Sequence, residues 1–165
     1  RFGNERGFTL MELLISVAIV VILAGVGIPI YIQFQARAKA SEANTNLNGI
    51  KLSQEGYKLS NGGYQTCAQH PAGTPDQNAV AWTGNADFNA IGFSTNGPVL
   101  FKYAVAAVAP SGSAAATFTA EALGDTDGDG DTVFYLVTDS TAPTVAAAGY
   151  TPATSLAIDG TPSDD

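Results

Sequence analysis

The acidic stretch from Asp125 to Asp131 carries the residues of this chain best suited to chemistry, because its carboxylates alternate with small residues. This spacing is typical of the first half of an EF-hand-like calcium loop. In such a loop, oxygens at positions one, three and five converge on the ion, and a glycine permits the sharp turn. Ca²⁺ is the one cofactor that the sequence suggests, and its predicted ligands are Asp125, Asp127, Asp129 and Asp131.

The second half of a calcium loop is missing from this stretch. Position twelve is Leu136, where a bidentate glutamate is expected, so Asp131 or Asp139 would have to take its place. The alternative is an acidic hairpin turn, because Asp and Gly are favoured in a tight turn between strands. Four crowded carboxylates repel each other unless water or a cation separates them, and both hypotheses stay open.

Catalytic residue sets are not evident. The chain has one histidine, His70, and one cysteine, Cys67, and we find no Ser/His/Asp set and no phosphate-binding loop. Two neighbouring ligands are too few for a zinc site, so a metal role for His70 is not expected. A lone cysteine is more simply a buried small apolar residue. The sequence therefore indicates a protein that is not an enzyme.

A single carboxylate, Glu12, stands at the edge of a long apolar segment. From Leu13 to Ile32 no side chain is charged over 20 residues. At about 1.5 Å per residue, a helix of this length spans a hydrocarbon core of roughly 30 Å. A carboxylate at such a rim is costly to desolvate and requires a partner. A secretory signal peptide would be cut after its apolar region, whereas a cut after Gly7 would keep the whole apolar helix.

The run Arg6-Gly7-Phe8-Thr9-Leu10-Met11-Glu12 resembles the processing motif of type IV pilins and of the related pseudopilins, a class III signal peptide with an N-methylation motif. The resemblance implies that a prepilin peptidase cuts between Gly7 and Phe8 and that the new N-terminal Phe8 is methylated. It also implies that Glu12, the fifth residue after the cut, is needed for assembly. An ordinary single-pass anchor with an incidental glutamate is the alternative, which the specificity of the motif disfavours.

Cleavage would supply a partner for Glu12. It converts the Phe8 nitrogen from a neutral amide into an amine that stays cationic after methylation, and in an apolar bundle this amine suits the Glu12 of a neighbouring subunit. In a subunit that assembles uncut, Arg6 or Arg1 would be the next candidate.

The elements that position these residues begin with one long helix, predicted from about Phe8 to about Leu59. Gly25, Gly27 and Pro29 lie close together in it, so we expect a kink or local melting there. Neighbouring groups in a membrane can satisfy the freed backbone, so this stretch could be helical before assembly and extended in a fibre. The position of Pro29 again resembles that of the family and implies a role in assembly.

Beyond Pro29 the helix becomes amphipathic, and Asn61-Gly62-Gly63 supplies its stop. Apolar residues recur every three or four positions and form one face of the helix, which contains a single polar residue. This face should pack on a sheet. The residues of this predicted face are Ala43, Leu47, Ile50, Gln54 and Tyr57.

The sequence pattern of the remaining chain predicts a small antiparallel sheet of three or four strands that packs against the helix. This α+β arrangement resembles the pilin fold. Strands are expected at Val99–Val108, Thr117–Leu123 and Thr132–Thr138, with weaker edge candidates at Val145–Tyr150 and Ser155–Ile158, and a helical turn near Ala86–Ile91. The predicted parts are a leader (residues 1–7), a transmembrane or filament-core helix (8–35) and a globular head (36–165). The head comprises a helix half (36–59), a loop region (60–98) and a sheet (99–165).

The charge is acidic and unevenly placed. The net charge is −8, and beyond Leu59 eleven Asp and Glu stand against the single Lys102. Such a head would repel nucleic acid and anionic lipid, so direct nucleic-acid binding is not expected.

The resemblance implies a structural subunit that polymerises through its N-terminal helix into a type IV pilus filament for adhesion, motility or uptake. Its partners would be identical subunits, the prepilin peptidase and the assembly machinery. It would lie in the bacterial inner membrane before assembly and in an extracellular filament afterwards.

The nearest alternative is a pseudopilin of a type II secretion system, which shares the leader, Glu12 and the helix. The calcium-like turn favours it slightly, and so does the lone Cys67, since many pilins close a C-terminal loop with a disulfide. An alternative of another class is a membrane-anchored calcium-binding or enzymatic domain.

Overall fold

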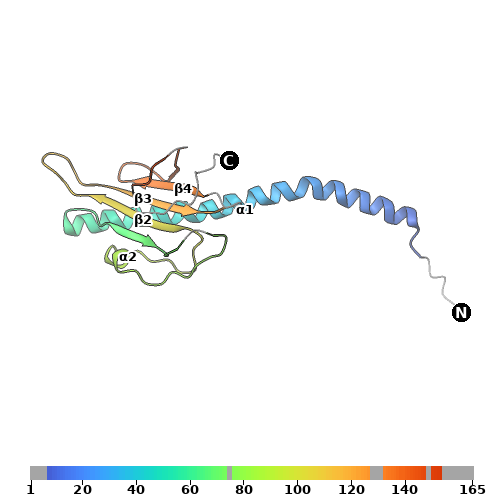
Figure 1. Cartoon of the computed structure of the whole chain (residues 1–165), viewed down its shortest axis with the longest axis horizontal. Helices are drawn as coiled ribbons and strands as arrows, with labels where there is room; N and C mark the ends of the chain where they lie inside the picture. The colour runs from blue at the N-terminus through green and yellow to red at the C-terminus, as the bar shows by residue number, and fades with distance from the viewer. Residues whose placement is uncertain (1–6, 74–75, 127–131, 148–149, 154–165) are drawn as a thin grey trace. The chain divides into compact units, whose positions relative to one another are not determined.

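The computed structural model describes residues 7–73, 76–126, 132–147 and 150–153. The chain divides into two compact units, Arg1–Gln35 and Ala36–Asp165. The elements, in chain order, are α1 (Leu10–Asn61), β1 (Cys67–His70), α2 (Ala86–Ala90), β2 (Lys102–Val108), β3 (Thr117–Gly124), β4 (Val133–Thr138) and β5 (Thr144–Val145) (Figure 1).

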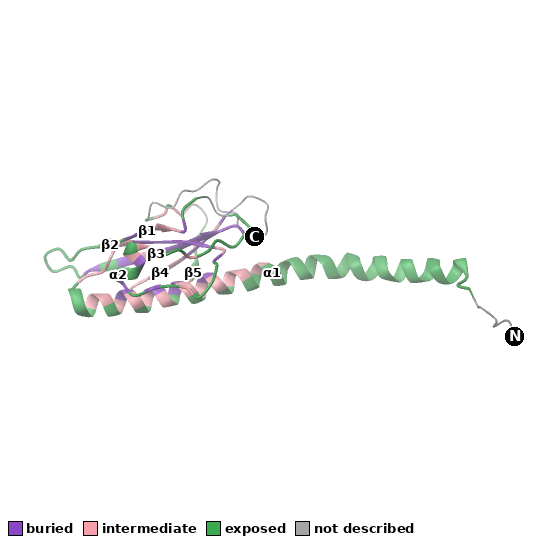
Figure 2. Ribbon diagram, turned by 90° about the horizontal axis from the view of Figure 1, so that it is seen from below, coloured by how far each residue is buried: buried purple, intermediate pink, exposed green. Residues whose placement is uncertain are grey.

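The first unit holds the apolar part of α1. Every described residue from Gly7 to Gln35 is exposed (Figure 2). Within the described chain α1 is the one helix long and apolar enough to cross a membrane, judged by length and composition. The predicted helix, 8–59, agrees with the observed bounds within two residues at each end.

Pro29 lies inside α1, and the helix continues through it. Local melting at Gly25–Pro29 was one of two predicted outcomes, and the helical assignment contradicts it for the isolated chain. A proline removes one backbone hydrogen bond, and the flanking turns retain their own. The observed state is the helical one that was expected before assembly.

The second unit is built on a five-stranded antiparallel sheet in the order β1-β2-β3-β4-β5. Its register places Val105 of β2 between Cys67 of β1 and Ala120 of β3, and Ala120 is opposite Val137 of β4. The prediction of three or four strands was therefore one or two short. β1 lies in the region predicted as loop, because its sequence Cys-Ala-Gln-His has no β-branched residue and no Phe, Tyr or Trp, and its pairing with β2 is a tertiary effect.

The predictions for β3 and β4 agree with the structure within one residue at each end, and the other two differ more. β2 begins at Lys102 rather than Val99, because Val99 instead forms an isolated bridge with Val80. The predicted edge strand Val145–Tyr150 was wrong over most of its described residues, since β5 covers Thr144–Val145 and shares only Val145 with it. The predicted strand Ser155–Ile158 lies outside the described residues. The predicted helical turn is α2, whose N-cap Asn85 accepts backbone hydrogen bonds from residues 87 and 88.

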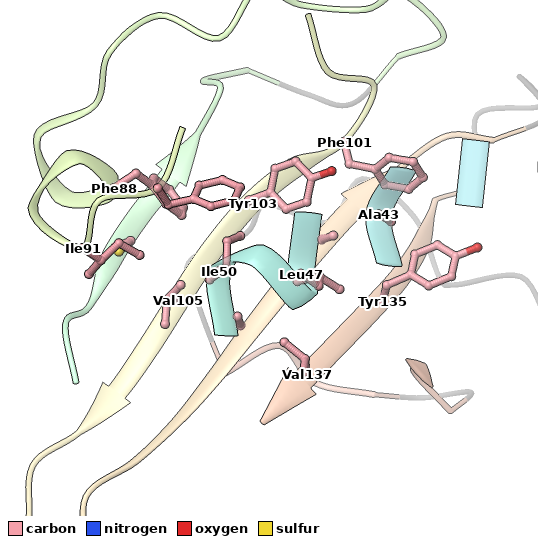
Figure 3. Packing of buried hydrophobic residues seen from close by; sticks show 14 of the residues in the cluster. Ala43, Leu47, Ile50, Phe88, Ile91, Phe101, Tyr103, Val105, Tyr135 and Val137 are labelled. Atoms are coloured by element: carbon pink, nitrogen blue, oxygen red, sulfur yellow. The ribbon is translucent and has the colours of Figure 1, made fainter. Parts of the chain in front are cut away.

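The main core lies between α1 and one face of the sheet, as Figure 3 shows. The predicted face of the helix is confirmed, since Ala43, Leu47, Ile50 and Gln54 are fully buried and Tyr57 is partly buried. Burying each large aliphatic side chain contributes about 1.5–3 kcal/mol. The side chains that meet this face include Phe101, which directly precedes β2, and Tyr103, Val105, Tyr135 and Val137 of the sheet.

The opposite face of the sheet is also covered. Ala104, Leu123 and Phe134 alternate with the residues of the main core and form a second, smaller buried cluster, against which Ala146 packs. Glu121, two residues before Leu123 on β3, is fully buried on this face. The sheet is therefore buried on both sides, which the sequence did not predict.

Candidate functional site

The start of α1 is closed by a capping box between Thr9 and Glu12. The Thr9 backbone N–H donates to Oε2 of Glu12 at 3.1 Å, and the Thr9 hydroxyl donates to the same oxygen at 3.0 Å. In return, the Glu12 backbone N–H donates to Oγ1 of Thr9 at 3.2 Å. This reciprocal arrangement satisfies N–H groups that a helix end otherwise leaves unpaired. Glu12 is thus partnered within its own subunit.

The carboxylate nevertheless remains accessible. Gly7, Phe8, Thr9 and Glu12 line an open hollow of about 430 Å³. The Phe8 side chain is 83% exposed, so it covers nothing in the isolated chain. Within the described residues, no hydrogen bond engages Oε1 of Glu12. That oxygen is available to a donor from outside the subunit.

Sequence reasoning proposed other partners for Glu12 and missed Thr9. The Phe8 amine of a neighbour stays a prediction, and Arg6 and Arg1 lie outside the described residues. The signal for Thr9 was readable, because a threonine followed three residues later by a glutamate just before an apolar run is the sequence pattern of a capping box.

Gly7 is not required by the fold of the subunit. A Cβ placed on it would meet no atom within 4 Å, and its backbone is not in the left-handed region. A side chain at this position would therefore fit the isolated chain. No contact with the described part of the chain therefore requires glycine at residue 7.

The acidic turn is described only at its first two residues. Asp125 is buried, with 9% of its surface exposed, just after the end of β3. The carbonyl of Thr126 accepts a hydrogen bond from Nζ of Lys39 on α1 at 2.8 Å. Asp127, Asp129 and Asp131 lie outside the described residues, so calcium ligation stays a prediction. Sequence reasoning missed the lysine, because contact across 87 positions leaves no local signal.

The prediction that Cys67 is buried is confirmed. Its side chain is 1% exposed and carries a free thiol. Burial, with a smaller contribution from the charge of Asp87, raises the pKa of this thiol to about 12. His70, on the same strand, packs edge to face on Trp82 with ring centroids 4.6 Å apart. Both side chains are parts of a packed core region.

The charged groups of the head are not all on its surface. Glu121 and Asp125, which were counted as part of an acidic face, are buried, and so is Lys102. Nζ of Lys102 donates to the carbonyl of Ala72 at 3.1 Å, and burial lowers the pKa of the amine. The prediction of an acidic surface was therefore wrong for these two carboxylates, whose strand or turn positions face inward.

Comparison with known families identifies the N-terminal segment. Residues 3–28 match the family described as the prokaryotic N-terminal methylation motif. The matched stretch contains Gly7, Phe8 and Glu12 and most of the exposed apolar helix. No curated protein matches the chain.

Proposed function

Since the chain belongs to the type IV pilin and pseudopilin family, with its methylation motif, long N-terminal helix and antiparallel sheet, we propose that it is a pilin that polymerises into a type IV pilus filament. The filament would serve adhesion, motility or uptake. The class III signal and the apolar helix imply a membrane or secreted location. An extracellular filament is the final location that we propose.

The exposed apolar segment of α1 carries this proposal. Side chains on all sides of the helix are exposed, including Ile22 at 69% and Leu23 at 66%. Apolar surface costs about 25 cal/mol per Å² in water, so the segment needs lipid or other apolar helices around it. Lipid would cover it before assembly, and the same helices of identical subunits would cover it in a filament core.

Glu12 would guide assembly in this scheme. A carboxylate in an apolar bundle is stable only when it is paired, and cleavage after Gly7 creates a cationic amine four residues away from it in sequence. The free Oε1 of Glu12 could accept from the amine of a neighbour while Oε2 remains in the capping box with Thr9. A subunit would thus keep its helix cap and gain an intersubunit contact.

Maturation by a prepilin peptidase is tested by substitution at Gly7. We expect Gly7→Val to remain uncut, although the folded subunit has room for the side chain. Gly63→Ala is the matched control, because a Cβ there also meets no atom within 4 Å and the position is far from the cut. Immunoblotting should show only the longer form for Gly7→Val and the short form for Gly63→Ala. Complete processing of Gly7→Val would count against the peptidase site.

The alternative role, a pseudopilin of a type II secretion system, is favoured by one observation. Cys67 is the only cysteine and is free and buried, so no disulfide within the chain closes the C-terminal region. Shearing of whole cells separates the two roles. A pilin should be recovered in filaments released from the cell surface, whereas a pseudopilin should stay with the cells.

A further inference from the structure

Glu121 is a carboxylate that is fully buried on the second face of the sheet. It lies in β3, opposite Ala104 of β2 and Leu136 of β4. The buried cluster on this face consists of Ala104, Leu123 and Phe134. A buried carboxylate is unfavourable unless hydrogen bonds compensate for the lost water. The bonds that Glu121 makes therefore indicate why an acid can occupy this position.

Two short hydrogen bonds join Glu121 to the C-terminal segment. Oε1 of Glu121 accepts from the hydroxyl of Tyr150 at 2.7 Å and from the backbone N–H of Ala153 at 2.7 Å. The Tyr150 ring also packs against Phe134, with centroids 6.2 Å apart. One oxygen thus contacts both ends of the stretch 150–153. The segment 150–153 thus contacts the middle of β3, although it lies 29 to 32 residues further along the chain.

Apolar packing alone would hold the segment 150–153 less firmly than these hydrogen bonds do. One ring pair, Tyr150 on Phe134, is the aromatic contact of this segment, and the side chain of Ala153 is small and exposed. The two hydrogen bonds to Oε1 of Glu121 have short lengths and defined directions, so they fix the positions of both donors. A buried polar contact of this kind selects one arrangement of the chain over other apolar packings.

We propose that Glu121 is a clasp that fastens the segment Tyr150–Ala153 over the second face of the sheet. Cys67 is the only cysteine, so no intrachain disulfide can fasten this segment. Releasing the clasp would loosen the cover over Phe134 and leave the main core between α1 and the sheet in place. The attachment of this segment to the head would then depend on the side chain of Glu121.

Hydrogen exchange of the full-length protein in detergent micelles tests the clasp. We expect Glu121→Ala to speed exchange of the peptide that contains residues 150–153 by about tenfold or more, because both acceptor contacts are lost. Glu121→Gln keeps the shape of the side chain but replaces one of its two oxygens with an amide nitrogen, so it should give a smaller increase than Glu121→Ala. Tyr150→Phe removes one contact and should also increase exchange.

Glu42 offers a matched control on the other side of the sheet. Its Oε1 likewise accepts from one backbone N–H, that of Leu100 at 2.9 Å, and from one tyrosine hydroxyl, that of Tyr103 at 3.4 Å. Glu42→Gln should speed exchange near Leu100 and leave the 150–153 peptide unchanged. The emission of Trp82, the only tryptophan, reports that the main core is intact in each variant.

Each outcome of the exchange experiment either supports or overturns the proposed role of Glu121. Faster exchange of the 150–153 peptide in Glu121→Gln or Tyr150→Phe, with native Trp82 emission, supports the clasp. Wild-type exchange in both of these mild variants overturns it, whether or not Glu121→Ala folds. Equal loosening by Glu42→Gln also overturns it, because the effect would then be a general loss of stability.

Discussion

Thr9 and Glu12 are hydrogen-bonded to each other at the first turn of α1. The backbone N–H and the hydroxyl of Thr9 both donate to Oε2 of Glu12. The acid at the rim of the apolar segment therefore has a partner before any second subunit arrives. Glu12 therefore has one observed role, in capping the helix, and one proposed role, in contacting a neighbouring subunit. They can be separated because only the first of them needs Thr9.

Substitution of Glu12 should impair assembly and leave membrane insertion intact. We expect Glu12→Ala and Glu12→Gln to reach the membrane in normal amounts but to give few filaments, because an intersubunit pair needs the charge. Thr9→Ala keeps the carboxylate and the backbone N–H of residue 9 and removes only the hydroxyl contacts of the cap, so it should assemble far better than either. Sheared filaments and membrane fractions of each variant are compared by immunoblotting. Normal filaments from Glu12→Gln would show that the charge is not used.

Substitution by alanine should lower the stability of the protein at Gly124 and raise it at Gly56. A Cβ on Gly124 would overlap the ring of Phe101, whereas one on Gly56, in α1, meets nothing within 4 Å. We expect Gly124→Ala to destabilise the protein by about 1–3 kcal/mol through overpacking. Gly56→Ala should stabilise it by about 1 kcal/mol through helix propensity. Thermal unfolding followed by Trp82 emission measures both, and equal melting temperatures would contradict the packing at Phe101.

The thiol of Cys67 should resist alkylation until the protein unfolds. Burial raises its pKa from the ordinary 9.0 to about 12, so the reactive thiolate is scarce at pH 8. We expect slow labelling in the native state and rapid labelling in denaturant. Because the folded pKa is the higher one, the stabilising contribution is complete below about pH 9 and is lost as the pH rises towards 12. Rapid native-state labelling at pH 8 would contradict this burial.

Calcium should raise the melting temperature if the acidic turn binds it. An ion that binds only the folded state stabilises it by about 2.7 kcal/mol at a hundredfold excess over Kd. We expect chelation to lower the melting temperature and Asp127→Ala to reproduce the chelated behaviour. Asp76→Asn, outside the turn, is the control. If the stretch is a plain turn, Asp127→Ala should relieve repulsion and leave stability equal or slightly higher.

The fold was predictable where one period governs the packing. Ala43, Leu47 and Ile50 recur at helical spacing, and that periodicity alone identified the face that packs on the sheet. β1 could not be predicted in this way, because four residues without β propensity become a strand only when β2 is beside them.

The site was predictable only in part, for a similar reason. Glu12 and Gly7 stand in a local motif that is readable in one dimension, and the cap at Thr9 could have been predicted from the same residues. Glu121 looked like a solvent-facing acid because the alternation of β3 gives two faces without saying that the second is covered. The chain returns over this face at Tyr150, and the hydroxyl of Tyr150 donates to Glu121.

Mass spectrometry of the N-terminal peptide from sheared filaments most directly tests assembly through a processed N-terminus. We predict a chain that begins at Phe8, carries a methyl group on its amine, and is recovered as a repeating subunit outside the cell. A filament whose subunits retain residues 1–7, or a processed chain that never leaves the membrane fraction, would contradict the proposed pilin.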